Sequence, residues 1–226
     1  MYEYIAESTR EFLGTAQRLN DGECGAGYYE ASSILVNVLS ALSSIAWPVE
    51  DKTTRKRFVE TLIRFSDSAY RITNVSIPLF ADAFIEDSAP ERKNAAVALR
   101  PSDAPPVGII IRTGNDIDID SDQLVLRYPC FTKPEVRKFS YADLLYGEVR
   151  CGLVHAYSLG KAVPFSLTKR NVLVSYVNSS DPETPSKMIH FHFNAMLSLV
   201  KGIAENLARE KALPLNAPAQ WWIEGA

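Results

Sequence analysis

A permanent cation and an imidazole stand close together late in the chain, since four residues separate Arg150 from His155. The planar guanidinium of an arginine matches the oxygens of a phosphate. A histidine side chain can gain or lose a proton near neutral pH. The two residues could therefore cleave a phosphodiester without a metal ion, with His155 moving the proton and Arg150 stabilising charge on the phosphate oxygens.

Four neighbouring side chains are candidates for a supporting role at this pair: Tyr146, Glu148, Cys151 and Tyr157. On a helix the two tyrosines lie nearer Arg150, and the other two form a row with His155. The row also allows a thiol nucleophile activated by the imidazole. That chemistry needs an orienting Asn or Asp, and none is identifiable, so a half-buried structural cysteine is the favoured interpretation.

A helix over residues 141–157 must position all of these side chains. Ser140 suits its N-cap, with Asp143 three residues later. Five positions on an ideal helix turn two side chains roughly 140° apart. The pair therefore converges only if Arg150 reaches round the helix, if the helix is distorted near Gly152, or if a second copy of the helix faces the first.

The rest of the chain predicts a mainly α fold in a single domain spanning residues 1–226. Apolar residues at helical spacing favour helices over 5–19, 26–46, 51–70, 78–85, 91–99 and 194–210. Strand signals lie at 107–113 and 123–128, interpreted as a hairpin, and at 171–177 and 188–193. We therefore expect a helical bundle with a small antiparallel β insertion, in a loop-rich stretch at about 88–135.

Charge and cysteine content narrow the function classes. A net charge of -3 excludes a nucleic-acid binder that works by bulk positive charge, but leaves room for a local basic site. The first candidates for phosphate contacts are Lys52, Arg55, Lys56 and Arg57. Three cysteines without metal-ligand spacing favour a reducing, cytoplasmic setting. No apolar run approaches the roughly 20 residues of a membrane helix, so no membrane partner is expected.

The segment Arg-Cys-Gly-Leu-Val-His at 150–155 follows Asp-Leu-Leu-Tyr at 143–146, and Tyr157 comes two residues after the histidine. This pattern, late in an all-α bundle, resembles the HEPN superfamily (higher eukaryotes and prokaryotes nucleotide-binding). The local sequence around the pair is similar to that of HEPN-like proteins of bacterial defence and toxin systems. The resemblance is closest over roughly 20 residues around the pair and architectural elsewhere.

The resemblance implies a metal-independent endoribonuclease that needs no cofactor and acts as a homodimer, with the two helices that carry the pair facing each other. Arg150 and His155 would be the catalytic residues, and Tyr157 matches a tyrosine of HEPN toxins paired with nucleotidyltransferases. The implied partners are RNA or a nucleotide, and an antitoxin or nucleotidyltransferase. The alternative is a non-catalytic HEPN-like module that binds a nucleotide, RNA or a protein.

Two other patterns could hold a metal ion, and both favour a simpler interpretation. Acidic residues alternate at 116, 118, 120 and 122, but an EF-hand needs Gly and Glu where this chain has Ser121 and Arg127. A solvated rim of the hairpin is therefore expected. His190 and His192 alternate with phenylalanines, which predicts a strand with its phenylalanines buried and its histidines exposed.

Overall fold

The computed structural model describes residues 2–48, 54–100, 112–156, 158–161, 172–178 and 187–224. The longer helices are α1 (Tyr2–Asn20), α2 (Tyr28–Ala46), α3 (Thr54–Phe65), α4 (Ile77–Phe84), α5 (Pro90–Leu99) and α11 (Phe193–Arg209). The shorter ones are α6 (Gly114–Ile117), α7 (Ser121–Arg127), α8 (Lys133–Arg137), α9 (Tyr141–Leu144) and α10 (Cys151–Ala156). A π-helical segment, Leu145–Arg150, joins α9 to α10. The mainly α fold predicted from the sequence is confirmed.

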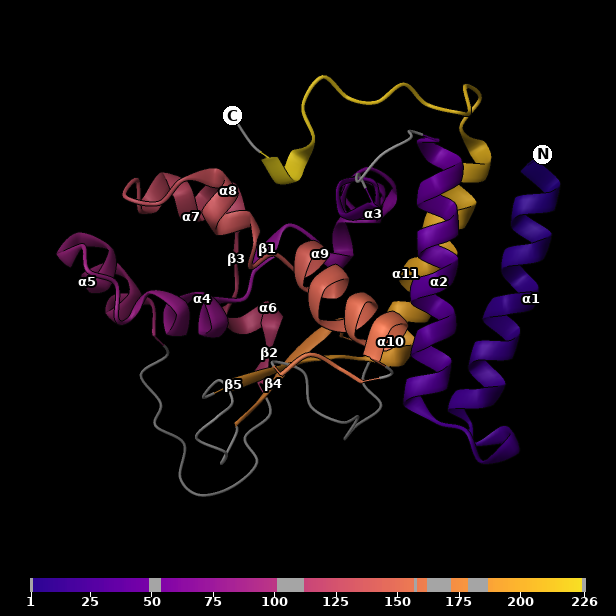
Figure 1. Cartoon of the computed structure of the whole chain (residues 1–226), viewed down its shortest axis with the longest axis horizontal. Helices are drawn as coiled ribbons and strands as arrows, with labels where there is room; N and C mark the ends of the chain where they lie inside the picture. The colour runs from indigo at the N-terminus through magenta and orange to yellow at the C-terminus, as the bar shows by residue number, and fades with distance from the viewer. Residues whose placement is uncertain are drawn as a thin grey trace.

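Helix α2 forms the centre of the bundle, with α1, α3 and α11 packed around it (Figure 1). Leu35, Leu39 and Leu42 recur on its buried face, and each is almost fully enclosed. Burial of such side chains contributes about 1.5–3 kcal/mol each. By length and composition α2 is the one described helix that could cross a membrane, and half of that window is buried inside the protein.

A second, aromatic core lies under α4, α5, α7 and α8, on the side of the molecule away from α1 (Figure 1). Phe80 is its centre, with ring contacts to Phe84, Phe131 and Phe139 at 4.8–5.4 Å between centroids. Phe139 also packs against the main core. The two cores therefore meet at the residue that immediately precedes the cap of α9.

In the described ranges, two small antiparallel sheets complete the fold. Strand β1 (Asn74–Val75) pairs with β3 (Ile119–Asp120), and β4 (Val174–Asn178) lies between β2 (Arg112–Thr113) and β5 (Lys187–Phe191). Within the sheet of β4, Tyr176 stands opposite Ile189 on β5 and Arg112 on β2. Chain segments far apart in the sequence are thus joined beside the bundle.

The predicted hairpin at 107–113 and 123–128 is wrong in the part that the structure describes. Residues 121–127 form α7, because Asp120 caps it and accepts the N–H groups of Asp122 and Gln123. Strand β2 pairs with β4 instead of a neighbour in sequence. The insertion at about 88–135 is therefore mostly helical where described, and residues 107–111 lie outside the described residues.

Candidate functional site

Helix α9, the π segment and α10 form one continuous element, here called the motif helix (residues 141–156). The Ser140 hydroxyl accepts the N–H of Asp143, as the sequence predicted. Leu145, Val149 and Leu153 are buried at steps of four residues. Four residues overshoot an α-helical turn by roughly 40°. The wider π turn, with Cys151 N–H bonded to the Tyr146 carbonyl, offsets that drift and keeps the stripe on the core.

Arg150 and His155 meet within one chain. Their Nη1 and Nε2 atoms are 3.2 Å apart, and His155 is exposed. A guanidinium has only donors, so the imidazole accepts this hydrogen bond at Nε2 and carries its proton on Nδ1. The sequence left three ways open for the pair to converge. In the structure the long Arg150 side chain reaches His155 within one chain, on a helix that is widened into a π turn up to Arg150.

The Arg150 side chain also lies over an aromatic ring. Its Cζ is 5.4 Å from the centroid of Tyr146, whose ring packs edge-on against Phe58 of α3 at 5.3 Å. A cation over an aromatic face is attracted to it, and more so where water is partly excluded. Burial, and secondarily the neighbouring Cys151 thiol, raise the pKa of Tyr146. The phenol therefore stays neutral and serves as a platform for the guanidinium.

The chain that follows the motif helix folds back along it. The N–H of Gly160 donates to the Glu148 carbonyl at 2.8 Å, and that of Ser158 donates to the Gly152 carbonyl at 3.2 Å. A Cβ on Gly152 would collide with the Ser158 carbonyl, and one on Gly160 would collide with Glu148. We call residues 158–160 the strap. The strap lies against the side of the helix that carries Glu148 and leaves the Arg150–His155 edge open.

The basic cluster that the sequence singled out is divided among different partners. The Arg55 guanidinium donates a hydrogen bond to each carboxylate oxygen of Asp143, both at 2.6 Å, and the Asp143 side chain is only 8% exposed. Burial raises the pKa of Asp143, and Arg55 opposes that rise. Lys56 forms an ion pair with Glu224, and Arg57 donates to the Trp47 carbonyl. Lys52 lies outside the described residues, as does Tyr157 of the motif.

The structure reveals a buried polar hub at the start of the motif helix, which the sequence did not predict. The Asp118 carboxyl accepts hydrogen bonds from Tyr141 and Tyr176 and from the N–H of Ile77. Burial raises the pKa of Asp118 to about 7. The expected solvated acidic rim is therefore wrong at this residue. The alternating acidic residues at 116–122 indicated that polar contacts form in this segment. They did not indicate that Asp118 would bond to the buried Tyr141 and Tyr176.

The two histidines of β5 and its end are buried, so the prediction that they are exposed is also wrong. His190 is 2% exposed, and neither of its ring nitrogens has a partner among the described residues. It stacks on Tyr28 of α2 and lies 4.4 Å from the ring of His192, which bonds to Ser175. Burial lowers the pKa of His190 to about 4. The sequence alternation predicted one face of this strand to be exposed, but α2 packs against that face, so both faces are covered.

Within the described ranges, no three potential metal ligands lie together. No protein-family model matches the chain, and neither a curated protein nor a solved structure is significantly similar to it. The resemblance to HEPN proteins therefore continues to rest on the motif residues. In the Arg150–His155 pair, a guanidinium, a group that matches phosphate, contacts an exposed imidazole, a group that can move a proton.

Proposed function

We propose that this protein is a metal-independent endoribonuclease of a bacterial toxin or defence system, with Arg150 and His155 as its catalytic pair. The observation that carries the proposal is the 3.2 Å contact between the guanidinium and the imidazole on an exposed helix edge. One side chain can hold a phosphate and the other can move a proton, within reach of the same bond. The motif resemblance supports RNA as the substrate.

The contact between the two side chains suggests how substrate engages them. In the free protein the Nε2 atom of His155 is occupied by Arg150. An RNA phosphate offers the guanidinium a bidentate, charge-assisted partner, which is stronger than a neutral nitrogen acceptor. Phosphate binding would therefore draw Arg150 away and free the Nε2 lone pair at the moment when a base is needed.

The proposed reaction uses the hydroxyl that distinguishes RNA from DNA. His155 accepts the proton of the 2′-hydroxyl, and the 2′-oxygen attacks the adjacent phosphorus. Arg150 stabilises the charge that builds on the non-bridging oxygens. The bond to the 5′-oxygen breaks, that oxygen takes a proton from an imidazolium, and the product ends in a 2′,3′-cyclic phosphate.

A homodimer would supply both proton carriers. One motif helix contributes one imidazole, and the reaction needs a base and an acid on opposite sides of the phosphorus. The exposed edge of the motif helix also carries Val154, an apolar side chain that is 38% exposed beside His155. Two such edges facing each other across a two-fold axis would cover both valines and set two Arg–His pairs around one phosphate.

The test is cleavage of end-labelled single-stranded RNA in a chelating buffer. We expect cyclic-phosphate products from the wild type, and none from Arg150→Ala or His155→Ala. Arg150→Lys should keep partial activity, because it retains the charge without the fork. His190→Phe, which removes a buried imidazole away from this edge, and Lys201→Ala on α11 are matched controls that should cleave normally.

Two results would contradict the proposal that the protein is a ribonuclease. Cleavage that survives both alanine variants would place the activity elsewhere. RNA binding without cleavage would replace the enzyme by the alternative, a binding module. A DNA oligonucleotide of the same sequence should remain intact, because it lacks the attacking hydroxyl. For the toxin role, expression in a bacterial host should arrest growth, and His155→Ala should relieve the arrest.

A further inference from the structure

Helix α3 packs against α9 and the π segment of the motif helix, and one ion pair joins the two elements (Figure 1). Arg55 donates through Nε and Nη2 to the two carboxylate oxygens of Asp143. The Asp143 side chain is almost fully buried, whereas that of Arg55 is 43% exposed. The guanidinium is planar, so Nη1 points away from this carboxylate, and it has no partner within the described ranges. Arg55 therefore keeps donors that a ligand can use.

The ion pair fixes the direction of the Arg55 guanidinium. A buried pair adds little stability over apolar side chains of similar size, although the loss of one partner is costly. Asp143 is itself held in the first helical turn, where its N–H donates to the Ser140 hydroxyl. A free arginine side chain loses rotamer entropy when it binds a ligand, and Asp143 removes much of that cost in advance. Arg55 is therefore preorganised for an anion such as a phosphate.

Two further cations lie along the same stretch of the motif helix. Burial raises the pKa of Asp143, and Arg55 and then Lys138 oppose that rise, so the Lys138 ammonium lies near the pair. Lys138 is exposed, and its ammonium forms no ion pair among the described residues. Burial also raises the pKa of Tyr146, and Arg150 and Arg55 both oppose that rise, so both guanidiniums lie near one phenol. Three cations against one carboxylate leave this stretch positively charged.

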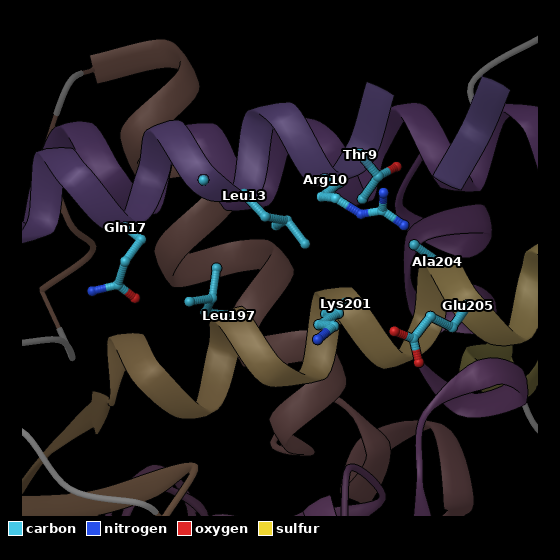
Figure 2. A pocket seen from close by; sticks show the side chains of 9 residues that line it. Thr9, Arg10, Leu13, Gln17, Leu197, Lys201, Ala204 and Glu205 are labelled. Carbon is cyan, nitrogen blue, oxygen red and sulfur yellow. The ribbon is translucent and has the colours of Figure 1, made fainter. Parts of the chain in front are cut away.

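The groove between α1 and α11 offers a comparison. It measures about 350 Å³, and Figure 2 shows that Arg10 of α1 and both Lys201 and Glu205 of α11 line it. Helix α2 contacts both α1 and α10, so this groove lies apart from the motif helix (Figure 1). Lys201 is exposed, as Lys138 is, but it lies beside a carboxylate on its own helix and far from the catalytic pair in the fold. It is therefore a matched control for the cations of the motif helix.

We propose that Arg55, held by Asp143 and assisted by Lys138, binds a second phosphate of the RNA strand whose scissile phosphate lies at Arg150. Asp143 and Arg150 are seven residues apart, a rise of roughly 10 Å along the helix. Both arginine side chains are long, so one strand can contact both with two of its phosphates. Rows of cations track the backbone of a single strand in this way. The proposal rests on the proposed ribonuclease and adds the course of its substrate, from Arg150 toward the start of the motif helix.

Fluorescence anisotropy of a short labelled single-stranded RNA tests this subsite, with every variant made in a His155→Ala background that leaves the RNA intact. We expect Lys138→Ala to weaken binding about fivefold and to lower the slope of log Kd against log salt by about 0.7, because one phosphate contact is lost. Lys201→Ala should leave both quantities unchanged. In cleavage assays with His155 present, the loss from Lys138→Ala should appear in KM rather than in kcat.

The variant Asp143→Asn separates positioning from charge. It removes a negative charge, so a subsite that works by charge alone would bind RNA more tightly. If Asp143 holds Arg55 in place, binding should instead weaken about threefold, because the ligand must then order the guanidinium. Arg55→Lys should also weaken binding, since it retains the charge and loses the planar fork. Chemical denaturation of the same preparations shows whether each variant is folded.

Three outcomes would overturn the subsite: unchanged RNA affinity in Lys138→Ala, tighter binding by Asp143→Asn, or an equal loss of affinity in Lys201→Ala. The last would mean that binding follows total charge. The ribonuclease fails separately. Cleavage by Lys138→Ala with unchanged KM removes the subsite alone, whereas RNA that binds through Arg55 and Lys138 but is never cleaved removes the enzyme alone. An absence of RNA binding would contradict both proposals.

Discussion

The two ends of the motif helix bear polar side chains in opposite settings. At its start, Tyr141 is buried and donates to Asp118, which is half-buried and also accepts from Tyr176 and the N–H of Ile77. At its end, Arg150 and His155 are bonded chiefly to each other at an exposed edge. Buried polar groups must find partners inside the fold, whereas exposed ones can exchange theirs for a ligand. The first end therefore holds the helix in place, and the second is available for chemistry.

The largest effect should separate activity from stability. His155→Ala removes the proposed proton carrier, so we expect RNA cleavage to fall by about 10³-fold. The free energy of unfolding should change by less than about 0.5 kcal/mol, because the side chain is exposed. Cleavage rates and chemical denaturation of the same preparation measure both. A large loss of stability in this variant would mean that the exposed end also anchors the helix.

Asp118, at the start of the motif helix, should make the stability of the protein fall as the pH rises. Burial raises the pKa of Asp118 from 3.8 to about 7, so the folded state holds its proton more tightly than the unfolded state does. The stability that this provides is complete below 3.8 and is lost as the pH rises through 7. The whole difference corresponds to about 4 kcal/mol. Asp118→Asn should remove this dependence, which denaturation at several pH values would measure against the wild type.

His190 should give a dependence of the opposite sign. Burial lowers its pKa from 6.5 to about 4, so stability is complete above 6.5 and is lost as the pH falls through 4, by up to about 3 kcal/mol. In the wild type, the pH dependences of stability from Asp118 and from His190 have opposite signs and partly cancel between pH 4 and pH 6.5. His190→Phe should expose the Asp118 slope alone, and Asp118→Asn the His190 slope alone. Parallel curves for the two variants would contradict both assignments.

The smallest expected effect concerns Asp143, in the first turn of the motif helix. Arg55→Ala leaves the Asp143 carboxylate buried without its bidentate partner, which should cost about 2 kcal/mol of unfolding free energy, since Arg55 itself is partly exposed. The double variant Arg55→Ala/Asp143→Asn should recover part of that loss. If Arg55 instead serves mainly in RNA binding, the single variant would keep its stability and lose affinity for RNA.

Helix positions could be predicted well from the sequence, because apolar periodicity and caps are local signals. Ser140 and the stripe at Leu145, Val149 and Leu153 place the motif helix correctly. The same stripe contained a further sign: two successive steps of four residues fit an α-helix poorly, and the structure accommodates them with a π turn. Periodicity alone does not reveal where a helix widens, since the core that selects the stripe is made by distant segments.

One failure was local: residues 123–127 carry strand-forming side chains, yet they are helical, and the sequence interpretation overlooked the capping carboxylate of Asp120. The other failures came where tertiary partners decide. Asp143 finds Arg55, a residue 88 positions away, and His190 is covered by α2. No local pattern gives these pairings. The sequence predicted the candidate catalytic pair from the types of Arg150 and His155 and from their spacing. It did not predict their 3.2 Å contact, nor the Tyr146 ring beneath the guanidinium.

The π turn leaves the motif helix with one surplus residue. Gly147 is exposed within it and has open space where a Cβ would stand. Deleting that glycine would let the segment close into regular α-helix while the anchored residues on either side keep their places. A single deleted codon at this point would therefore be absorbed by the turn itself, without any change to the core or to Arg150, which lies between the anchored Val149 and Leu153.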